Sequence, residues 1–183
     1  MKRTWAEVDF DKLAHNYHAL RGLAPAGTKY LGLVKADAYG HGAVPVAKKL
    51  EELGADYLGV ACLDEAIEVR EAGVKTPILI LGCTSSIYAA ELVKYNITQA
   101  CYDLEYAKEL SAGAQKAGGT ITVHIQCDTG MTRLGFMCHE ETMEKSASEI
   151  IEAVKLPGLK AEGIFTHFSD SDGSEEYTML QFG

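Results

Sequence analysis

Lys35 and Tyr39 stand out in this 183-residue chain because their types and spacing suit covalent chemistry with a carbonyl group. Lys35 ends an apolar run, and Tyr39 follows on a segment that contains Gly40 and Gly42. A neutral lysine amine attacks an aldehyde, and glycines let a ligand approach the backbone closely. The same pattern also fits a lysine that extends from a strand end into solvent.

Two later segments carry an arginine and a histidine at similar places. The Asp-Thr-Gly sequence at 128–130 predicts a turn after an apolar run, and Arg133 follows it. A guanidinium there can bind a carboxylate, or it can pair with a surface acid. His167 ends the last apolar run, where it fits either a hydrogen-bonded core residue or a ligand-binding one.

The sequence predicts no metal centre. Asp170 and Asp172 lie on a Ser/Gly segment, but two carboxylates are too few ligands. None of the five cysteines forms a CxxC pair, which argues against a disulfide framework or a structural zinc site. We expect the cysteines to be small buried side chains in a reducing, cytoplasmic protein.

Composition narrows the class of protein. Hydrophobic residues make up 47% of the chain, as in ordinary globular proteins. The 17 basic against 26 acidic residues give a net charge of −9, which argues against a nucleic-acid partner. There is no apolar run of about 18 residues, so we expect no membrane span, and the N-terminus does not resemble a secretory signal.

Apolar runs alternate with helical patterns along most of the chain. The runs lie at 30–35, 57–62, 77–82, 97–102, 121–127 and 162–168. Near the N-terminus, the alternating segment 4–10 predicts a short strand, and Asp9 caps a first helix. Further helical spacing falls at 43–53, 63–72, 87–95, 103–117, 140–154 and 175–182. This alternation predicts an α/β fold with a parallel sheet. The sheet is either open and doubly wound or part of a (β/α)₈ TIM-type barrel, and with about six of the eight units that barrel is incomplete.

Four motifs together resemble the alanine racemase family. They are TWAEVDFDKLAHNY at 4–17, VKADAYGHG at 34–42, DTGMTRLG at 128–135 and GIFTHFSDSD at 163–172. The family uses pyridoxal 5′-phosphate (PLP), and its barrel is followed by a C-terminal β domain in a head-to-tail homodimer. The resemblance therefore implies that residues 1–183 are the N-terminal PLP-binding barrel domain, truncated, without the C-terminal domain.

The resemblance assigns a role to each candidate residue. Lys35 corresponds to the lysine that bonds to PLP and serves as one of two acid/base groups. Tyr39 corresponds to the tyrosine that contacts the cofactor phosphate. Arg133 corresponds to the arginine beside the PLP phenolic oxygen and the substrate carboxylate, and His167 to the histidine near the pyridine ring. We expect these four residues to meet at the carboxyl ends of the strands.

The reaction that the family implies is racemisation of L-alanine to D-alanine, which supplies peptidoglycan. The second face of the substrate is served by a tyrosine from the partner subunit's C-terminal domain, which is not in these 183 residues. We therefore expect this chain alone to lack measurable activity, to bind PLP weakly and to self-associate, and the native protein to continue past Gly183.

Three alternatives remain open. Many family members carry a carbamylated lysine where this chain has Gln126, so a bound anion or the glutamine oxygen must orient Arg133. This difference keeps a serine or broad-range racemase open. Outside the enzymes, the chain fits a non-catalytic PLP-binding protein of the single-domain barrel type, or a domain that folds and binds nothing.

Overall fold

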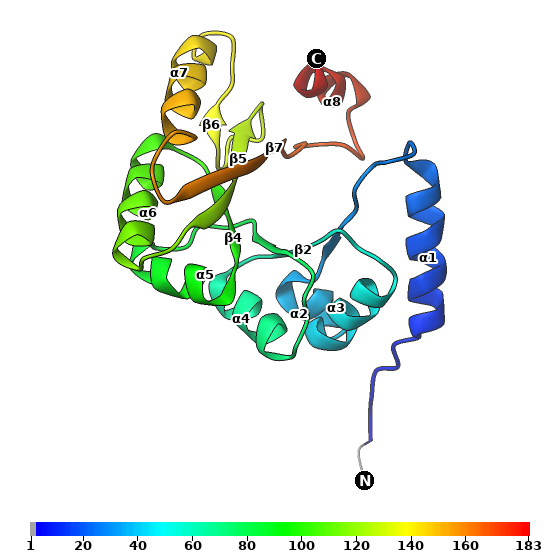
Figure 1. The fold of residues 1–183 in the computed structure, drawn as a ribbon. Helices are drawn as coiled ribbons and strands as arrows, with labels where there is room; N and C mark the ends of the chain where they lie inside the picture. The colour runs from blue at the N-terminus through cyan, green and yellow to red at the C-terminus, as the bar shows by residue number, and fades with distance from the viewer. Residues whose placement is uncertain (1–2) are drawn as a thin grey trace. The chain divides into compact units, whose positions relative to one another are not determined.

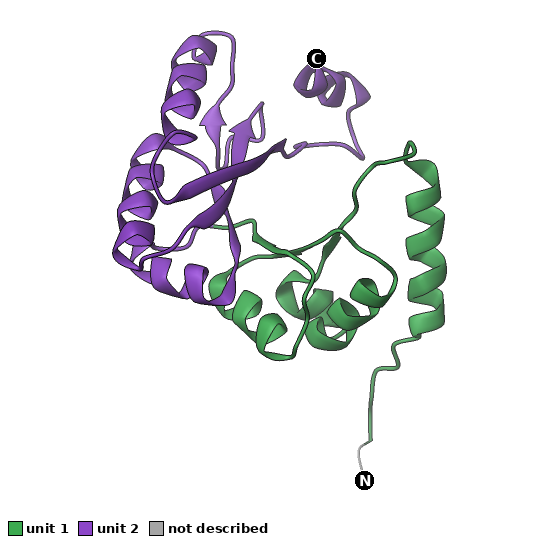
Figure 2. Ribbon diagram, viewed as in Figure 1, with its two compact units in different colours: residues 1–82 green, residues 83–183 purple. Residues whose placement is uncertain are grey.

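The computed structural model describes residues 3–183, which form two compact units that divide after Gly82 (Figure 2). The predicted domain starts at Met1, and its first two residues lie outside the described part. Figure 1 labels the helices and strands used below.

Unit 1 is a parallel sheet with helices. Its elements are α1 (Phe10–Leu23), β1 (Leu31–Leu33), α2 (Lys35–Gly40), α3 (Ala43–Glu52), β2 (Tyr57–Val60), α4 (Leu63–Glu71) and β3 (Ile78–Ile80). β1 pairs with β2, and β2 pairs with β3, both in parallel. The strands therefore follow chain order, as the barrel prediction requires and a strand-order reversal would not allow.

Unit 2 is built around a long central strand. Its elements are the 3-10 helix η1 (Ser86–Tyr88), α5 (Ala89–Tyr95), β4 (Thr98–Cys101), α6 (Leu104–Lys116), β5 (Ile121–Asp128), β6 (Phe136–Met137), α7 (Met143–Ala153), β7 (Leu159–Thr166) and α8 (Glu175–Phe182). β5 pairs in parallel with β4 and, along residues 121–127, with β7. β6 pairs with Cys127 and Asp128, past the end of β4, because β7 already occupies the other edge there.

Apolar side chains hold each unit together. In unit 1 the strand residues Leu58, Ile78 and Ile80 are fully buried, and α4, which buries Ala66 and Val69, packs on β2 and β3. In unit 2, α6 buries Leu110 and Ala114, whose spacing places them on one helix face. The predicted α/β fold of parallel strands and helices is therefore confirmed.

Two predictions about the N-terminal region have different outcomes. Asp9 caps α1 as expected, because its Oδ1 accepts from the backbone N–H groups of Asp11 and Lys12 at 3.0 and 3.1 Å. The strand predicted over 4–10 is wrong, since residues 4–9 are irregular and Phe10 begins α1. An alternating segment becomes a strand only beside another strand, and no other strand in the described part of the chain pairs with it.

Other predictions need correction in detail. Cys62 and Cys83 are exposed, not buried, whereas Cys101 is buried and all five cysteines are free. β1 ends at Leu33, so Lys35 lies past the strand.

No helix in residues 3–183 is long and apolar enough to cross a membrane.

Candidate functional site

The backbone after β1 turns in the opposite hand to an ordinary helix. Residues 36–39 have φ between 51° and 55° and ψ between 38° and 49°, and none of them is glycine. An L-residue in this region costs about 1–2 kcal/mol, so four in succession cost on the order of 4–8 kcal/mol. Strain of this kind persists only where surrounding contacts hold it, and it concentrates at functional sites.

Hydrogen bonds close the turn from within and from outside. The N–H of Ala38 donates to Val34 O, and the N–H of Gly42 donates to Asp37 O, each at 2.9 Å. The Asp37 carboxylate accepts from the N–H of Ala43 at 2.6 Å and so connects the turn to α3. Glu65 Oε1 on α4 accepts from the N–H of Ala36 at 2.8 Å.

The turn presents Lys35 and Tyr39 together. Lys35 Nζ lies 5.8 Å from the centre of the Tyr39 ring, a cation–π distance. Lys35 is half-buried, and Tyr39 is 61% exposed. One short segment therefore offers a primary amine and an accessible phenol hydroxyl to the same neighbourhood.

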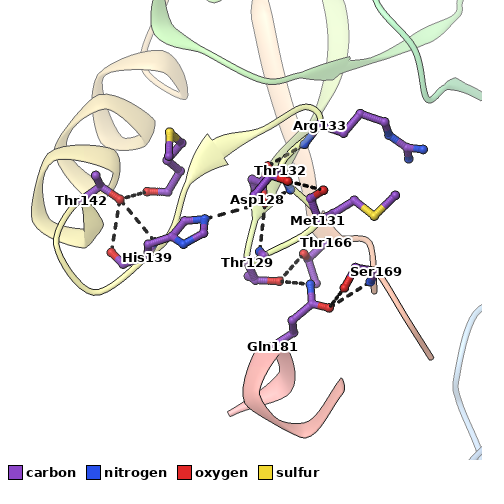
Figure 3. A network of polar contacts seen from close by, with 12 residues as sticks. Asp128, Thr129, Met131, Thr132, Arg133, His139, Thr142, Thr166, Ser169 and Gln181 are labelled. Carbon is purple, nitrogen blue, oxygen red and sulfur yellow. Dashed lines mark hydrogen bonds and ion pairs between the residues drawn. The ribbon is translucent and has the colours of Figure 1, made fainter. Parts of the chain in front are cut away.

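Asp128 organises the loop that carries Arg133 (Figure 3). Its Oδ1 accepts from the N–H groups of Gly130 and Thr132 at 3.0 and 2.9 Å, and its Oδ2 accepts from the Arg133 N–H at 3.0 Å. Burial raises the pKa of Asp128, but these three N–H donors, with His139 nearby, bring the pKa below its ordinary value. The turn predicted at 128–130 is thus a loop wrapped around one carboxylate.

Gly135 closes this loop against β5. A Cβ at Gly135 would lie 2.6 Å from Asp128 N and 2.9 Å from Gln126 O, and its φ is 134°. A larger residue would push the loop away from the strand. The Arg133 side chain is exposed and extends away from Asp128 in Figure 3, so its guanidinium is free to meet a ligand from solvent.

His167 comes directly after β7, and Gln181 ties its backbone to the neighbouring loop. Gln181 Nε2 donates to His167 O at 3.3 Å and to Thr129 Oγ1 at 3.2 Å. Thr129 and Thr166 share a hydroxyl–hydroxyl hydrogen bond of 2.7 Å. The loops after β5 and β7 are therefore joined through one buried amide of α8 (Figure 3).

The candidate residues thus fall into two pairs. Lys35 and Tyr39 share the turn of unit 1, whereas Arg133 and His167 lie on adjacent loops of unit 2. Sequence reasoning missed the supporting residue Gln181, for which the sequence carries no signal. It also missed Glu65, although a glutamate at the third position of a helix is a capping signal.

Two other expectations concern polar residues of unit 2. Gln126 is 5% exposed on β5, and its Oε1 has no hydrogen-bond partner within residues 3–183, so the glutamine oxygen does not orient Arg133. Asp170 and Asp172 are exposed, and residues 3–183 contain no cluster of three or more histidine, cysteine, aspartate or glutamate side chains that could hold a metal ion.

Comparison with known proteins decides the family. The alanine racemase N-terminal domain family matches residues 8–183. The chain belongs to this family. It is 45% identical to the alanine racemase of Clostridium perfringens over all 183 residues, which cover 46% of that protein. The chain therefore spans about half the length of the curated relatives it matches.

Solved structures agree with this assignment. The alanine racemase of Clostridium difficile 630 superposes with a TM-score of 0.93 at 44% identity, over 100% of this chain and 47% of that one. A histidine racemase from Leuconostoc mesenteroides superposes with a TM-score of 0.81 at 28% identity, and the match covers 94% of this chain and 45% of the histidine racemase chain. The resemblance to the family and the expected TIM-type barrel fold of its N-terminal domain are thereby confirmed.

The residues present suit PLP chemically. Lys35 supplies the primary amine that a pyridoxal aldehyde requires, and the exposed Tyr39 hydroxyl can donate to a phosphate. Arg133 supplies an exposed, permanently charged group for an anionic oxygen.

Proposed function

We propose that this chain is the N-terminal, PLP-binding portion of an alanine racemase that interconverts L- and D-alanine. The observation that carries the proposal is the strained turn at 36–39, which sets the Lys35 amine beside Tyr39 within the VKADAYGHG motif. Similarity to alanine racemases along the whole chain supports the same activity. In this proposal residues 1–183 form the cofactor domain of a longer, cytoplasmic homodimer that supplies D-alanine for peptidoglycan.

Bound PLP supplies the electron sink that makes the α-proton of an amino acid acidic. Lys35 Nζ would hold the cofactor and, once the substrate amine has displaced it and freed its own amine, would take or return the α-proton on one face of the substrate. Tyr39 Oη donates a hydrogen bond to the phosphate. With PLP bound, the Arg133 guanidinium would bind the substrate carboxylate and the phenolic oxygen of the cofactor, and His167 would lie near the pyridine ring.

The second face of the substrate needs another acid/base group. A lysine on one side of the α-carbon cannot deliver a proton to the other side, so racemisation requires a second group there. We propose that this group is a tyrosine of the partner subunit's C-terminal domain, outside residues 1–183. The isolated chain then lacks measurable racemase activity, since a missing acid or base typically costs about 10²–10⁴ in rate.

Labelling of Lys35 tests the cofactor role directly. The chain is incubated with excess PLP, reduced with borohydride and mapped by peptide mass spectrometry. We expect the label on Lys35 before any other lysine and its loss in Lys35→Ala, while the exposed α3 control Lys48→Ala keeps it. Equal labelling of the surface lysines, or unchanged labelling in Lys35→Ala, would refute the proposal.

A second candidate function is racemisation of another amino acid. It is favoured by Gln126, which replaces the carbamylated lysine of many relatives, and by the similarity to a histidine racemase. Turnover assays of the longer protein with alanine, serine and histidine distinguish the two functions, because the preferred substrate is the one with the highest kcat/KM.

A further inference from the structure

Glu65 lies outside the turn and accepts a hydrogen bond from the first backbone amide of the turn, that of Ala36. Its Oε1 accepts from the Ala36 N–H at 2.8 Å, and its Oε2 accepts from the Ala61 N–H at 2.7 Å. One half-buried carboxylate of α4 therefore joins the chain after β1 to the chain after β2. All of these groups belong to unit 1.

Helix capping explains only half of this geometry. Glu65 is the third residue of α4, the position whose carboxylate normally reaches back to the start of its own helix. The bond to Ala61 resembles that arrangement. The bond to Ala36 lies 29 residues away in sequence and contributes nothing to the α4 cap, so it points to a role in the turn.

The Ala36 amide matters because it is the peptide group directly after Lys35. Its direction fixes the backbone torsion ψ of Lys35 and the entry into residues with positive φ. If this N–H loses its acceptor, the turn loses its hydrogen bond to α4, and residues 36–39 can relax toward the right-handed conformations that L-residues prefer. The Lys35 side chain then no longer leaves the backbone in one direction.

We propose that Glu65 is a positioning residue for Lys35, which sets the direction of the amine by holding the left-handed turn. This inference rests on the proposed function for its link to PLP. A carboxylate suits the task because both of its oxygens accept hydrogen bonds, and both face backbone N–H groups. A glutamine would turn an NH₂ group against one of those donors.

The test compares Glu65→Gln with the matched control Glu68→Gln, an exposed glutamate on the same helix. The first readout is hydrogen exchange of single amides in the 183-residue chain without cofactor. In Glu65→Gln we expect exchange at Ala36 or Ala61 to accelerate about tenfold or more, as loss of a hydrogen bond to a charged group implies, with Leu58 unchanged. Glu65→Asp is too short to reach both donors, so exchange should accelerate at Ala36 or at Ala61. This second variant keeps the test decisive if Glu65→Gln does not fold.

The second readout is the rate at which PLP and borohydride label Lys35. We expect about a tenfold loss in Glu65→Gln and none in Glu68→Gln. Unchanged exchange at both Ala36 and Ala61 in the two Glu65 variants would overturn the proposal, as would faster exchange at either amide with undiminished labelling of Lys35. If the unaltered chain takes no PLP at Lys35, the proposed function fails, whereas exchange at Ala36 still decides whether Glu65 holds the turn.

Discussion

Gln181 Oε1 accepts hydrogen bonds from both the backbone N–H and the hydroxyl of Ser169, at 2.9 and 3.0 Å. With its two donated bonds to Thr129 and His167, the side-chain amide uses its full hydrogen-bonding capacity. Gln181 is also 6% exposed, while Leu180 and Phe182 beside it are each 74% exposed. α8 is therefore held on unit 2 mainly by polar contacts.

Replacing Gln181 should release α8 from the two loops. Gln181→Ala removes the four part-buried hydrogen bonds to Thr129, His167 and Ser169, so we expect a loss of about 1–3 kcal/mol in the free energy of unfolding. Leu180→Ala is the matched control and should change stability by less than about 0.5 kcal/mol. Urea denaturation measures both values, and equal stabilities would show that the network contributes nothing.

Asp128 should make the stability of the chain sensitive to acid. Its carboxylate has a lowered pKa in the fold, so its contribution is fully present above the unfolded value of about 3.9 and is lost as pH falls through the folded value. Asp128→Asn should destabilise the chain at neutral pH by about 1–3 kcal/mol. It should also flatten the dependence of stability on pH below about pH 5. An unaltered pH profile, measured by denaturation at several pH values, would contradict this assignment.

Glycine should be tolerated unusually well in the turn after β1. Ala36 is exposed and has φ 51°, so Ala36→Gly removes a steric cost of about 1–2 kcal/mol and adds an entropic cost of about 0.5–1 kcal/mol. We expect stability to stay constant or rise by up to about 1.5 kcal/mol. Ala147→Gly, at an exposed position inside α7, should lose about 1 kcal/mol. Equal losses in the two variants, measured by thermal or urea unfolding, would mean that the turn is not left-handed in solution.

The core of unit 2 should depend strongly on α6. Leu110 is fully buried, and Leu110→Ala should cost about 2–5 kcal/mol in the free energy of unfolding. Leu23, at the end of α1, is 83% exposed, and Leu23→Ala should have an effect below about 0.5 kcal/mol. A small effect at Leu110 in urea denaturation would show that α6 does not bury this side chain in solution.

Periodicity predicted the fold well where burial decides the structure. The pattern over 103–117 gave α6, observed at Leu104–Lys116, because one face of that helix must be apolar. The strand predicted at 162–168 begins earlier, at Leu159, since its first residues are held by pairing with β5 and not by burial. Two-residue β6 is too short to produce any pattern.

For the candidate site, the sequence predicted the residue identities but not the backbone shape. The identities of Lys35, Tyr39, Arg133 and His167 came from motifs, and whether they form one site stays a prediction. The shape of the turn around Lys35 could not be predicted, because propensity favours right-handed conformations for alanine, aspartate and tyrosine. Contacts from Asp37 and Glu65 help to support the other hand, and the Glu65 contact is non-local.

The left-handed turn also limits how this motif can be reused. The nine residues at 34–42 are the most recognisable segment of the sequence, yet their backbone shape depends on a carboxylate in α4. A peptide of these nine residues, or a graft of them into a foreign loop, should relax to right-handed or extended conformations. For protein engineering, the smallest transferable piece is therefore the segment from β1 to the first turn of α4, which includes the carboxylate that holds the turn.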